Sequence, residues 1–282
     1  MTEPATFGPE WSASLRLGTD AELRGWLDVA QAACDEADTI ARAHFRRDLH
    51  IEAKPDRTFV TEADTAVEAR IRERILAAYP AHGIVGEEYG TERAGAAVRW
   101  YVDPIDGTHN FMRGVPLFGT LLGIERDGVL QAAVLSAPAF GSRWWAHRGG
   151  GAWARHSGDT APRRIRTSGV TALEDAQVLY GSSRDLVSSG LAPGFDGLLD
   201  AVWRERGFGD FWGHMLVAEG IADVMVEPIL DIWDIAAVIP IVQEAGGRTT
   251  DRRGAVRADG GNAVTTNGVL HDAVLEIMGD RS

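Results

Sequence analysis

The chain has few of the features that mark secreted or membrane-spanning proteins. Its 282 residues hold one cysteine, Cys34, which excludes a disulfide framework within the chain and fits a reducing compartment. No apolar run approaches the roughly 18 residues that a membrane-spanning helix needs. The first residues, MTEPATFGPE, show neither the basic nor the apolar segment of a secretory signal. We therefore predict a cytoplasmic protein that does not enter a membrane.

Basic residues are scarce relative to acidic ones. The 28 lysines and arginines face 41 aspartates and glutamates, which gives a net charge of −13. Nucleic acids and anionic membrane surfaces attract basic patches, so we predict neither as a partner. A phosphorylated small molecule stays compatible with this charge, because carboxylates gather around divalent cations that in turn hold phosphate.

Two common functional motifs are also missing. The eight histidines show neither HxH nor HExxH spacing, which argues against a histidine zinc site. No GxxxxGK[ST] sequence is present, and the three glycines at 149–151 are interpreted as a turn rather than a phosphate loop.

What is present is a mixture of helical and extended periodicity. Helices are predicted over residues 20–47, 61–78, 195–206, 212–222, 233–247 and 268–279. Strands are predicted within residues 82–88, 98–107, 118–139, 142–154, 163–168, 176–183, 223–228 and 262–267. The pair Asp127-Gly128 is typical of a hairpin turn, and Glu68 can pair with Arg72 one helical turn later. The mixture predicts an α/β (α+β) protein in which sheets are layered with helices.

The domain organisation follows from the same pass along the chain. Residues 1–19 carry no periodicity, and we interpret them as a flexible extension. No linker or internal repeat interrupts residues 20–282, which are predicted to form a single domain with two sub-lobes.

The segment DPIDGT, which begins at Asp103, is poor helix and poor strand. The preceding VRWYV is predicted to be a strand that delivers Asp103 at its end, and Pro104 keeps that residue extended. Asp106 then returns toward the same space in a tight turn, and Gly107 permits close backbone approach. Thr108 begins a short helical turn whose free N–H groups favour an oxyanion. One loop thus offers two carboxylates and a phosphate nest, which suits Mg²⁺ that bridges protein and substrate.

Acidic residues at other predicted element ends can complete a metal cluster. Glu87 ends a strand, Asp64 lies in the first turn of a helix, and Asp234 follows Asp231 at another helix start. Two cations roughly 4 Å apart can hold phosphate and activate water. Structural interpretations stay open: Asp64 and Asp234 can favour helix N-termini. Glu87 with Glu88 can form a solvated turn, and DPIDGT can be an ordinary turn.

Four short motifs stand out together. VTEAD, GEE, DPIDGTHNF and WDIAA occur at residues 60–64, 86–88, 103–111 and 233–237. Their order and spacing resemble the inositol monophosphatase-like family of metal-dependent phosphatases, over about residues 20–280. The resemblance implies a layered αβαβα sandwich of the inositol monophosphatase and sugar phosphatase type. It also implies two or three Mg²⁺ ions per active site, a homodimer and a small phosphorylated metabolite as substrate.

Carried over by motif, the resemblance gives individual residues a role. The implied metal ligands are Glu87, Asp103, the carbonyl of Ile105, Asp106 and Asp234. The implied catalytic residues are Asp64, Glu87 and Thr108. Within that set, Asp64 and Thr108 orient and help to deprotonate the attacking water. The implied substrate-binding residues are Asp106, Gly107, Thr108, His109, Arg206, Asp210, Glu227 and Asp234.

Longer segments resemble the bacterial histidinol-phosphate phosphatase branch of that family. They are NFMRGVP, LSAPAFGSRWWA, RERGFGDFWGHMLVAEG and GGNAVTTNGVLHDAVL. The branch implies hydrolysis of L-histidinol phosphate to L-histidinol and phosphate in histidine biosynthesis. Such a substrate carries an ammonium and an imidazole, so its pocket should hold acids that metal does not use; Glu227 and Asp210 are candidates. His109 departs from the branch, which usually has lysine there, and so removes a permanent cation.

Competing interpretations stay open for several of these residues. Asp210 can cap the helix that follows it, Arg206 can form a structural salt bridge, and Trp144 and Trp145 can pack rather than stack on substrate. The alternative function is an inositol-1-monophosphatase or a broad sugar-phosphate monoesterase. A nucleotide 3′-phosphatase or fructose-bisphosphatase, a silent metal-binding member and a two-metal nuclease are less favoured. No basic adenine-phosphate pocket is visible, no expected ligand is missing, and the charge disfavours nucleic acid.

Overall fold

The computed structural model describes residues 17–54 and 59–279, so residues 1–16 of the predicted flexible extension lie outside the described part. The helices are α1 Asp20–His44, α2 Glu62–Ala78, α3 Thr108–Met112, α4 Ser183–Ser188, α5 Ala192–Ala201, α6 Asp210–Ala218, α7 Ile232–Ala236, α8 Val238–Glu244 and α9 His271–Met278. The first strands are β1 Ile51–Ala53, β2 Phe59–Thr61, β3 Gly83–Gly86, β4 Gly90–Glu92, β5 Val98–Asp106, β6 Gly119–Arg126, β7 Val129–Ala137 and β8 Ser142–His147. The later strands are β9 Gly151–Arg155, β10 Arg163–Arg164, β11 Gln177–Tyr180, β12 Arg204–Arg206, β13 Val224–Glu227, β14 Arg248–Thr250 and β15 Ala263–Thr266.

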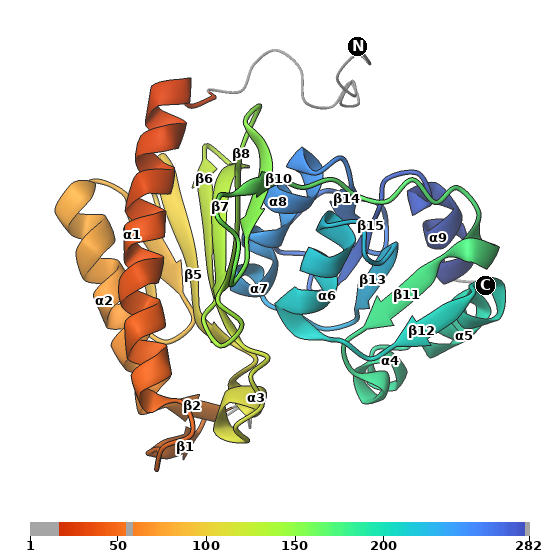
Figure 1. Ribbon diagram of the computed structural model, residues 1–282, viewed down its shortest axis with the longest axis horizontal. Coiled ribbons are helices and arrows are strands. Elements are labelled where there is room, and N and C mark those ends of the chain that lie inside the picture. The colour runs from red at the N-terminus through yellow and green to blue at the C-terminus, as the bar shows by residue number, and fades with distance from the viewer. Residues whose placement is uncertain (1–16, 55–58, 280–282) are drawn as a thin grey trace.

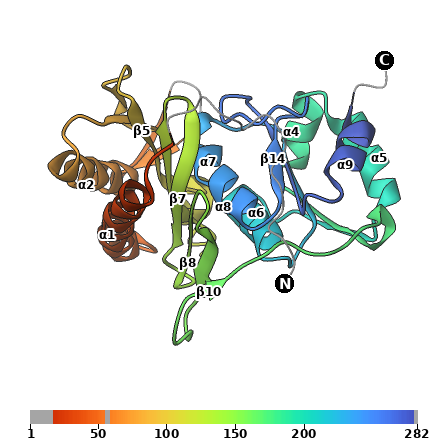
Figure 2. The same cartoon turned by 90° about the horizontal axis from the view of Figure 1, so that it is seen from above.

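These elements stack in five layers (Figure 1). Helices α1 and α2 cover one face of an eight-stranded sheet with the order β10-β9-β8-β7-β6-β5-β3-β4. Helices α6, α7 and α8 lie between that sheet and a five-stranded sheet with the order β12-β11-β13-β15-β14. Helices α4, α5 and α9 form the outer layer, and the view from above shows the same succession (Figure 2). The predicted αβαβα sandwich is confirmed.

Apolar clusters hold the layers together, including a small one of Leu179, Val217, Ala222 and Met225 between α6 and the five-stranded sheet. The stripe on α1 that includes Leu23, Leu27 and Ala30 is buried with residues of α2 against the large sheet. The opposite face of that sheet packs on α6 and α8, and the five-stranded sheet packs on α5 and α9. None of the helices within the described ranges is both long and apolar enough to cross a lipid bilayer.

Two predicted helices are wrong in extent. The helix predicted over 195–206 ends at Ala201, and Arg204–Arg206 instead forms β12, which pairs in parallel with β11. The helix predicted over 233–247 divides at Ala237. Pro240 has no N–H to donate to the carbonyl four residues earlier, and its ring crowds that carbonyl, so the backbone breaks between α7 and α8. The predicted hairpin at Asp127-Gly128 is confirmed, with positive φ at both residues.

A buried histidine links the fold to pH. Burial, helped by the charge of Arg248, lowers the pKa of His271 to about 4, and the ring bonds the hydroxyls of Thr250 and Thr266 at 2.9 and 3.0 Å. The unfolded chain binds this proton near pH 6.5, whereas the folded chain binds it only near pH 4. The preference of the fold for neutral His271 therefore does not reduce the free energy of unfolding above pH 6.5. As the pH falls toward 4, this preference lowers the free energy of unfolding by about 3 kcal/mol in total.

We expect the difference in unfolding free energy between the wild type and His271→Gln to report this loss. The measurement is urea unfolding between pH 8 and 4.5 with chelator present. The unfolding free energy of the wild type, relative to that of His271→Gln, should fall by about 1.4 kcal/mol per pH unit below 6.5. Taking the difference cancels the titration of the acidic residues, which both proteins share. A difference that stays constant over this range would contradict a neutral His271 in the fold.

Candidate active site

The predicted site residues meet where two neighbouring strands of the large sheet end. Strands β3 and β5 are parallel, and Gly86 pairs with Val102. The next residues along the two strands are Glu87 and Asp103, so the ladder places them side by side. The N-terminus of α7, which carries Asp234, approaches the same edge from the middle layer.

Strand β5 contains a bulge that aims its two aspartates together. Asp103 pairs with Leu121 and Asp106 with Gly119, so two residues on β5 oppose one residue on β6. Residues three apart point to opposite faces of a regular strand, and the extra residue of a bulge corrects this. Pro104 is tolerated because it lies within the bulge. The tight turn predicted for DPIDGT is therefore wrong: the strand continues to Asp106, and the turn begins at Gly107.

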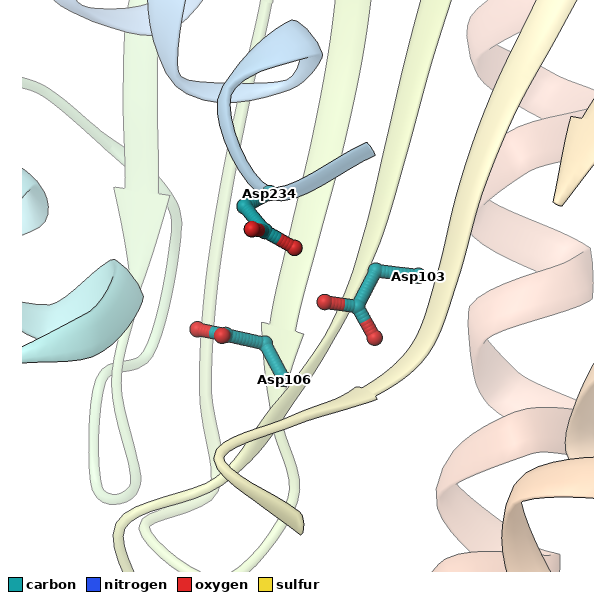
Figure 3. Close-up of side chains that lie close together, drawn as sticks. All are labelled: Asp103, Asp106 and Asp234. Carbon is teal, nitrogen blue, oxygen red and sulfur yellow. The ribbon is translucent and has the colours of Figure 1, made fainter. Parts of the chain in front are cut away.

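Three carboxylates converge in this bulge. Asp103, Asp106 and Asp234 have oxygen atoms within 4.8 Å of one another, and Figure 3 shows the three side chains pointing into one space. Burial and the charges of neighbouring acids raise the pKa of Asp103 and Asp106 well above the usual range. Burial likewise raises the pKa of Asp234 to about 7. Like charges at this spacing are unfavourable without a counterion, so the cluster calls for a cation.

The donor set fits a hard divalent cation. Asp103 Oδ1 is buried and has no hydrogen-bond partner among the described residues, so the atom is available as a ligand. All three side chains offer oxygen, which Mg²⁺ prefers to nitrogen or sulfur donors. Asp234 also serves the fold, because its Oδ2 accepts the Asp231 N–H at 2.7 Å. Asp234 therefore both accepts a hydrogen bond at the start of α7 and belongs to the carboxylate cluster.

Glu87 lies beside the cluster rather than within it. Its Oε1 accepts from Lys54 Nζ at 2.9 Å, and the same ammonium contacts Glu88 at 2.8 Å. Even so, Glu87 is the neighbouring charge that acts most strongly on Asp103, where burial and then Glu87 raise the pKa. The contact with Lys54 joins residues 33 and 34 positions apart, and no sequence motif pointed to it.

Asp64 and Thr108 lie within hydrogen-bonding distance of each other. Thr108 Oγ1 lies 3.3 Å from Asp64 Oδ1 and 3.0 Å from the carbonyl of Ile105. One hydroxyl proton serves one acceptor at a time. The other Asp64 oxygen accepts the N–H of Thr61 at 2.8 Å and so caps α2. Asp64 is fully buried, and burial raises the pKa of its carboxyl.

Gly107 shapes the backbone at the start of α3. Its φ is 81°, a left-handed value that favours glycine, and a Cβ atom there would lie 2.9 Å from the carbonyl of Leu117. His109 is exposed and its ring meets Phe59 edge-on at 5.5 Å. A side chain at Gly107 would also crowd the Asp210 carboxylate, at 3.3 Å, so glycine lets the chain turn between Asp106 and α3.

Asp210 does not cap the helix that follows it, so that interpretation is wrong. Gly209 occupies the cap position and, as a glycine, has no side chain that could bond the first turn of α6. Asp210 has a φ of 56°, unusual for a residue with a Cβ, and its carboxylate accepts from Asn110 Nδ2 at 3.1 Å. The next N–H, that of Phe211, is donated to Asp106 Oδ2 at 2.8 Å. Asn110 was not predicted, although it follows directly on the DPIDGTH motif.

Glu227 ends β13, and its carboxylate lies close enough to Asp210 and Asp234 for their charges to act on it. Its Oε2 is buried and lacks a hydrogen-bond partner among the described residues. Gly181 lies against it, since a Cβ there would meet Oε1 at 2.0 Å. Burial, followed by the charges of Asp210 and Asp234, raises the pKa of Glu227 well above the usual range. Glu227 and Asp210 thus add two acids near the three that converge.

Arg206 and the two tryptophans lie outside this group. Arg206 is exposed on the edge strand β12, where its guanidinium donates to the Glu205 carbonyl at 2.6 Å. It forms no ion pair with any residue of the described ranges. Trp144 is buried and donates to Glu219 at 2.6 Å, and Trp145 packs on the core under α1. The packing interpretation of both tryptophans is thus the correct one.

Comparisons with known proteins give a consistent result. The model of the inositol monophosphatase family matches residues 22–280. A histidinol-phosphatase of Mycobacterium tuberculosis is 46% identical over 88% of this chain and 96% of its own length. A histidinol-phosphatase of Streptomyces coelicolor is 42% identical over 90% of this chain and 97% of its own length. Among solved structures, the extragenic suppressor protein suhB of Bartonella henselae superposes with a TM-score of 0.82. That pair shares 27% identity and covers 92% and 100% of the two chains.

Proposed function

The chain belongs to the inositol monophosphatase family, and from that premise we propose that it hydrolyses the phosphomonoester of L-histidinol with Mg²⁺ as its cofactor. Two relatives named histidinol-phosphatase, at 46% and 42% identity, support this choice of substrate. The product set is L-histidinol and phosphate, which makes the reaction a step of histidine biosynthesis. A homodimer and two or three Mg²⁺ ions per site stay predictions of the family resemblance, and a cytoplasmic location stays a prediction from the sequence composition.

The observation that carries the proposal is the unpartnered carboxylate of Glu227. A buried acid that no protein donor satisfies is costly, and Glu227 Oε2 is such an atom. Asp210 adds a second carboxylate nearby. A substrate with an ammonium group would satisfy both, whereas a neutral polyol would leave Glu227 without its charge partner. Histidinol phosphate carries that ammonium on the carbon next to its phosphorylated CH₂ group, with the imidazole farther from the phosphate.

The cation site and the backbone would hold the phosphate. Asp103, Asp106 and Asp234, with Glu87, would bind Mg²⁺; when bound, it supplies positive charge that polarises the ester and acidifies water. The free N–H groups at the start of α3, which directly follows Asp106 and Gly107, would favour an oxyanion. The ammonium and imidazole of the substrate would then face Glu227 and Asp210.

Asp64 and Thr108 would handle the proton of the attacking water. The Thr108 hydroxyl orients the water and passes its own proton to Asp64 Oδ1 as it accepts one. Burial raises the pKa of Asp64, which makes its carboxylate a stronger base than an exposed aspartate. The 3.3 Å separation is long for a hydroxyl donor, as is common before substrate tightens a site.

The test is phosphate release from a panel by wild type and Glu227→Gln. We expect histidinol phosphate to be the best substrate, ahead of inositol 1-phosphate, fructose 1,6-bisphosphate and an adenosine bisphosphate. Glu227→Gln should lower kcat/KM for histidinol phosphate about 10- to 150-fold, since a charge-assisted hydrogen bond contributes roughly 1.5–3 kcal/mol. Glycerol 2-phosphate, which has no ammonium, should be hydrolysed within about threefold of the wild-type rate.

The matched control is Glu205→Gln on the exposed strand β12, which should leave both substrates unaffected. Equal losses on both substrates in Glu227→Gln would show that Glu227 supports the cluster or the fold instead. If inositol 1-phosphate is the faster wild-type substrate, the histidinol assignment is wrong and the sugar-phosphate alternative takes its place.

A further inference from the structure

Glu68 lies buried beneath the loop that carries Glu87. It occupies α2 one helical turn after Asp64 and has no exposed surface. Its Oε2 accepts the N–H of Glu88 at 2.7 Å, and its Oε1 accepts the N–H of Tyr89 at 3.2 Å. The carboxylate therefore binds the backbone at the two positions that directly follow Glu87.

Gly86 makes this contact possible from the other side. A Cβ atom at Gly86 would lie 2.0 Å from Glu68 Oε1, so no larger residue fits while Glu68 keeps its place. The backbone on both sides of Glu87 thus depends on one side chain: Gly86 packs on it and the next two N–H groups bond to it. Since Gly86 pairs with Val102, this same segment sets Glu87 beside Asp103.

Arg72 completes the arrangement. Its Nε donates to Glu68 Oε1 at 2.7 Å, as the spacing of the two residues on α2 predicts, and its Nη2 donates to the Gly90 carbonyl. An exposed helical pair of this kind stabilises a helix by only about 0.3–0.5 kcal/mol. That small gain does not account for a carboxylate buried completely against loop N–H groups, because taking the charge out of water costs several kcal/mol.

We propose that Glu68 is a positioning residue that acts through the backbone of residues 86–89 to hold the Glu87 carboxylate in place for a divalent cation. This inference rests on the proposed function, in which Glu87 helps to bind the metal. Glu68 touches neither substrate nor metal. Every group that faces its two oxygens is a donor, so an ionised carboxylate suits the position, whereas glutamine would turn an NH₂ group toward another donor.

The experiment measures Mn²⁺ binding to the full-length protein by calorimetry, without substrate, for wild type and Glu68→Gln. We expect Glu68→Gln to bind Mn²⁺ about 10- to 100-fold more weakly, the usual effect of removing a partner that orients a ligand. In the assay the concentration of Mg²⁺ needed for half-maximal rate should rise by a similar factor. At saturating Mg²⁺, kcat should return to within about threefold of wild type.

The matched control is Glu73→Gln, the same change on the same helix at an exposed position that pairs with Arg70. It should bind Mn²⁺ like the wild type. Wild-type affinity in Glu68→Gln, or a loss of kcat that added Mg²⁺ does not restore, would overturn the positioning role. If the wild-type protein itself does not bind Mn²⁺, the proposed function is wrong. If only the positioning role is wrong, the wild type still binds Mn²⁺, so the experiment distinguishes the two failures.

If Glu68→Gln does not fold, Glu68→Asp provides the test of the positioning role. This variant keeps the charge but withdraws both oxygens by one methylene group, so the proposal requires at least a tenfold loss of Mn²⁺ affinity. Unchanged affinity in Glu68→Asp would overturn it.

Discussion

Asp103→Asn is expected to lower kcat at least about 10³-fold, which corresponds to about 4 kcal/mol of barrier. Asp103 is the most enclosed member of the convergent trio, with 2% of its surface exposed. Its Oδ1 lacks any partner within the described part of the chain. Asparagine keeps the volume but replaces one ligand oxygen with an NH₂ group, which repels a cation. Excess EDTA should abolish wild-type activity, and added Mg²⁺ should restore it.

The same substitution should not harm the fold. Without metal, burial and then the charges of Glu87, Asp106 and Asp234 disfavour the ionised Asp103 carboxylate and raise its pKa. Removing that charge relieves the repulsion, so the metal-free variant should melt at or above the wild-type temperature. Asp28→Asn, a matched change at an exposed position on α1, should leave both rate and stability unchanged. Retention of more than a tenth of wild-type turnover in Asp103→Asn would show that Asp103 is not a ligand.

Local signals in the sequence were sufficient to predict much of this site. Each acid stands at the end of a strand or the start of a helix, and chain direction alone brings such ends to one edge. The predicted start of α2 at residue 61 or 62 is confirmed, and the structure adds that Thr61 and Asp64 form a capping box there. The layered fold followed from the family resemblance of the motifs rather than from periodicity.

The features that sequence reasoning missed depend on pairing between distant segments. Strand β5 bulges because two of its residues lie opposite one residue of β6. The DPIDGT sequence alone does not specify this pairing. The strand β12 forms where β11 offers a free edge, although the residues continue a helical pattern. Lys54 reaches Glu87 and Glu88 across more than 30 positions. In each case the contact that fixes the structure comes from a residue far away in the sequence. Local propensity of the segment itself therefore could not predict it.

Thr108→Ala and Asp64→Asn are expected to lower kcat by about 10²- to 10⁴-fold, the usual contribution of general base catalysis. KM should change little, because proton transfer takes place in the transition state and not in the bound ground state. Thr65→Ala provides the matched control. Thr65 lies on the same helix as Asp64, and its hydroxyl donates to the Glu62 carbonyl, so the rate should stay at the wild-type value.

The double variant distinguishes a relay from two separate roles. If the proton passes from Thr108 Oγ1 to Asp64 Oδ1, removing either group breaks the same path, so both changes together should cost about as much as one. Asp64 also caps α2 through Thr61, but asparagine keeps an oxygen that can accept that N–H, so neither Asp64→Asn nor Thr108→Ala should unfold the protein. Melting curves check that a loss of kcat is not a loss of folded protein. Losses in kcat that multiply in the double variant would contradict a shared proton path. A rise in KM at unchanged kcat in Thr108→Ala would instead make Thr108 a phosphate ligand.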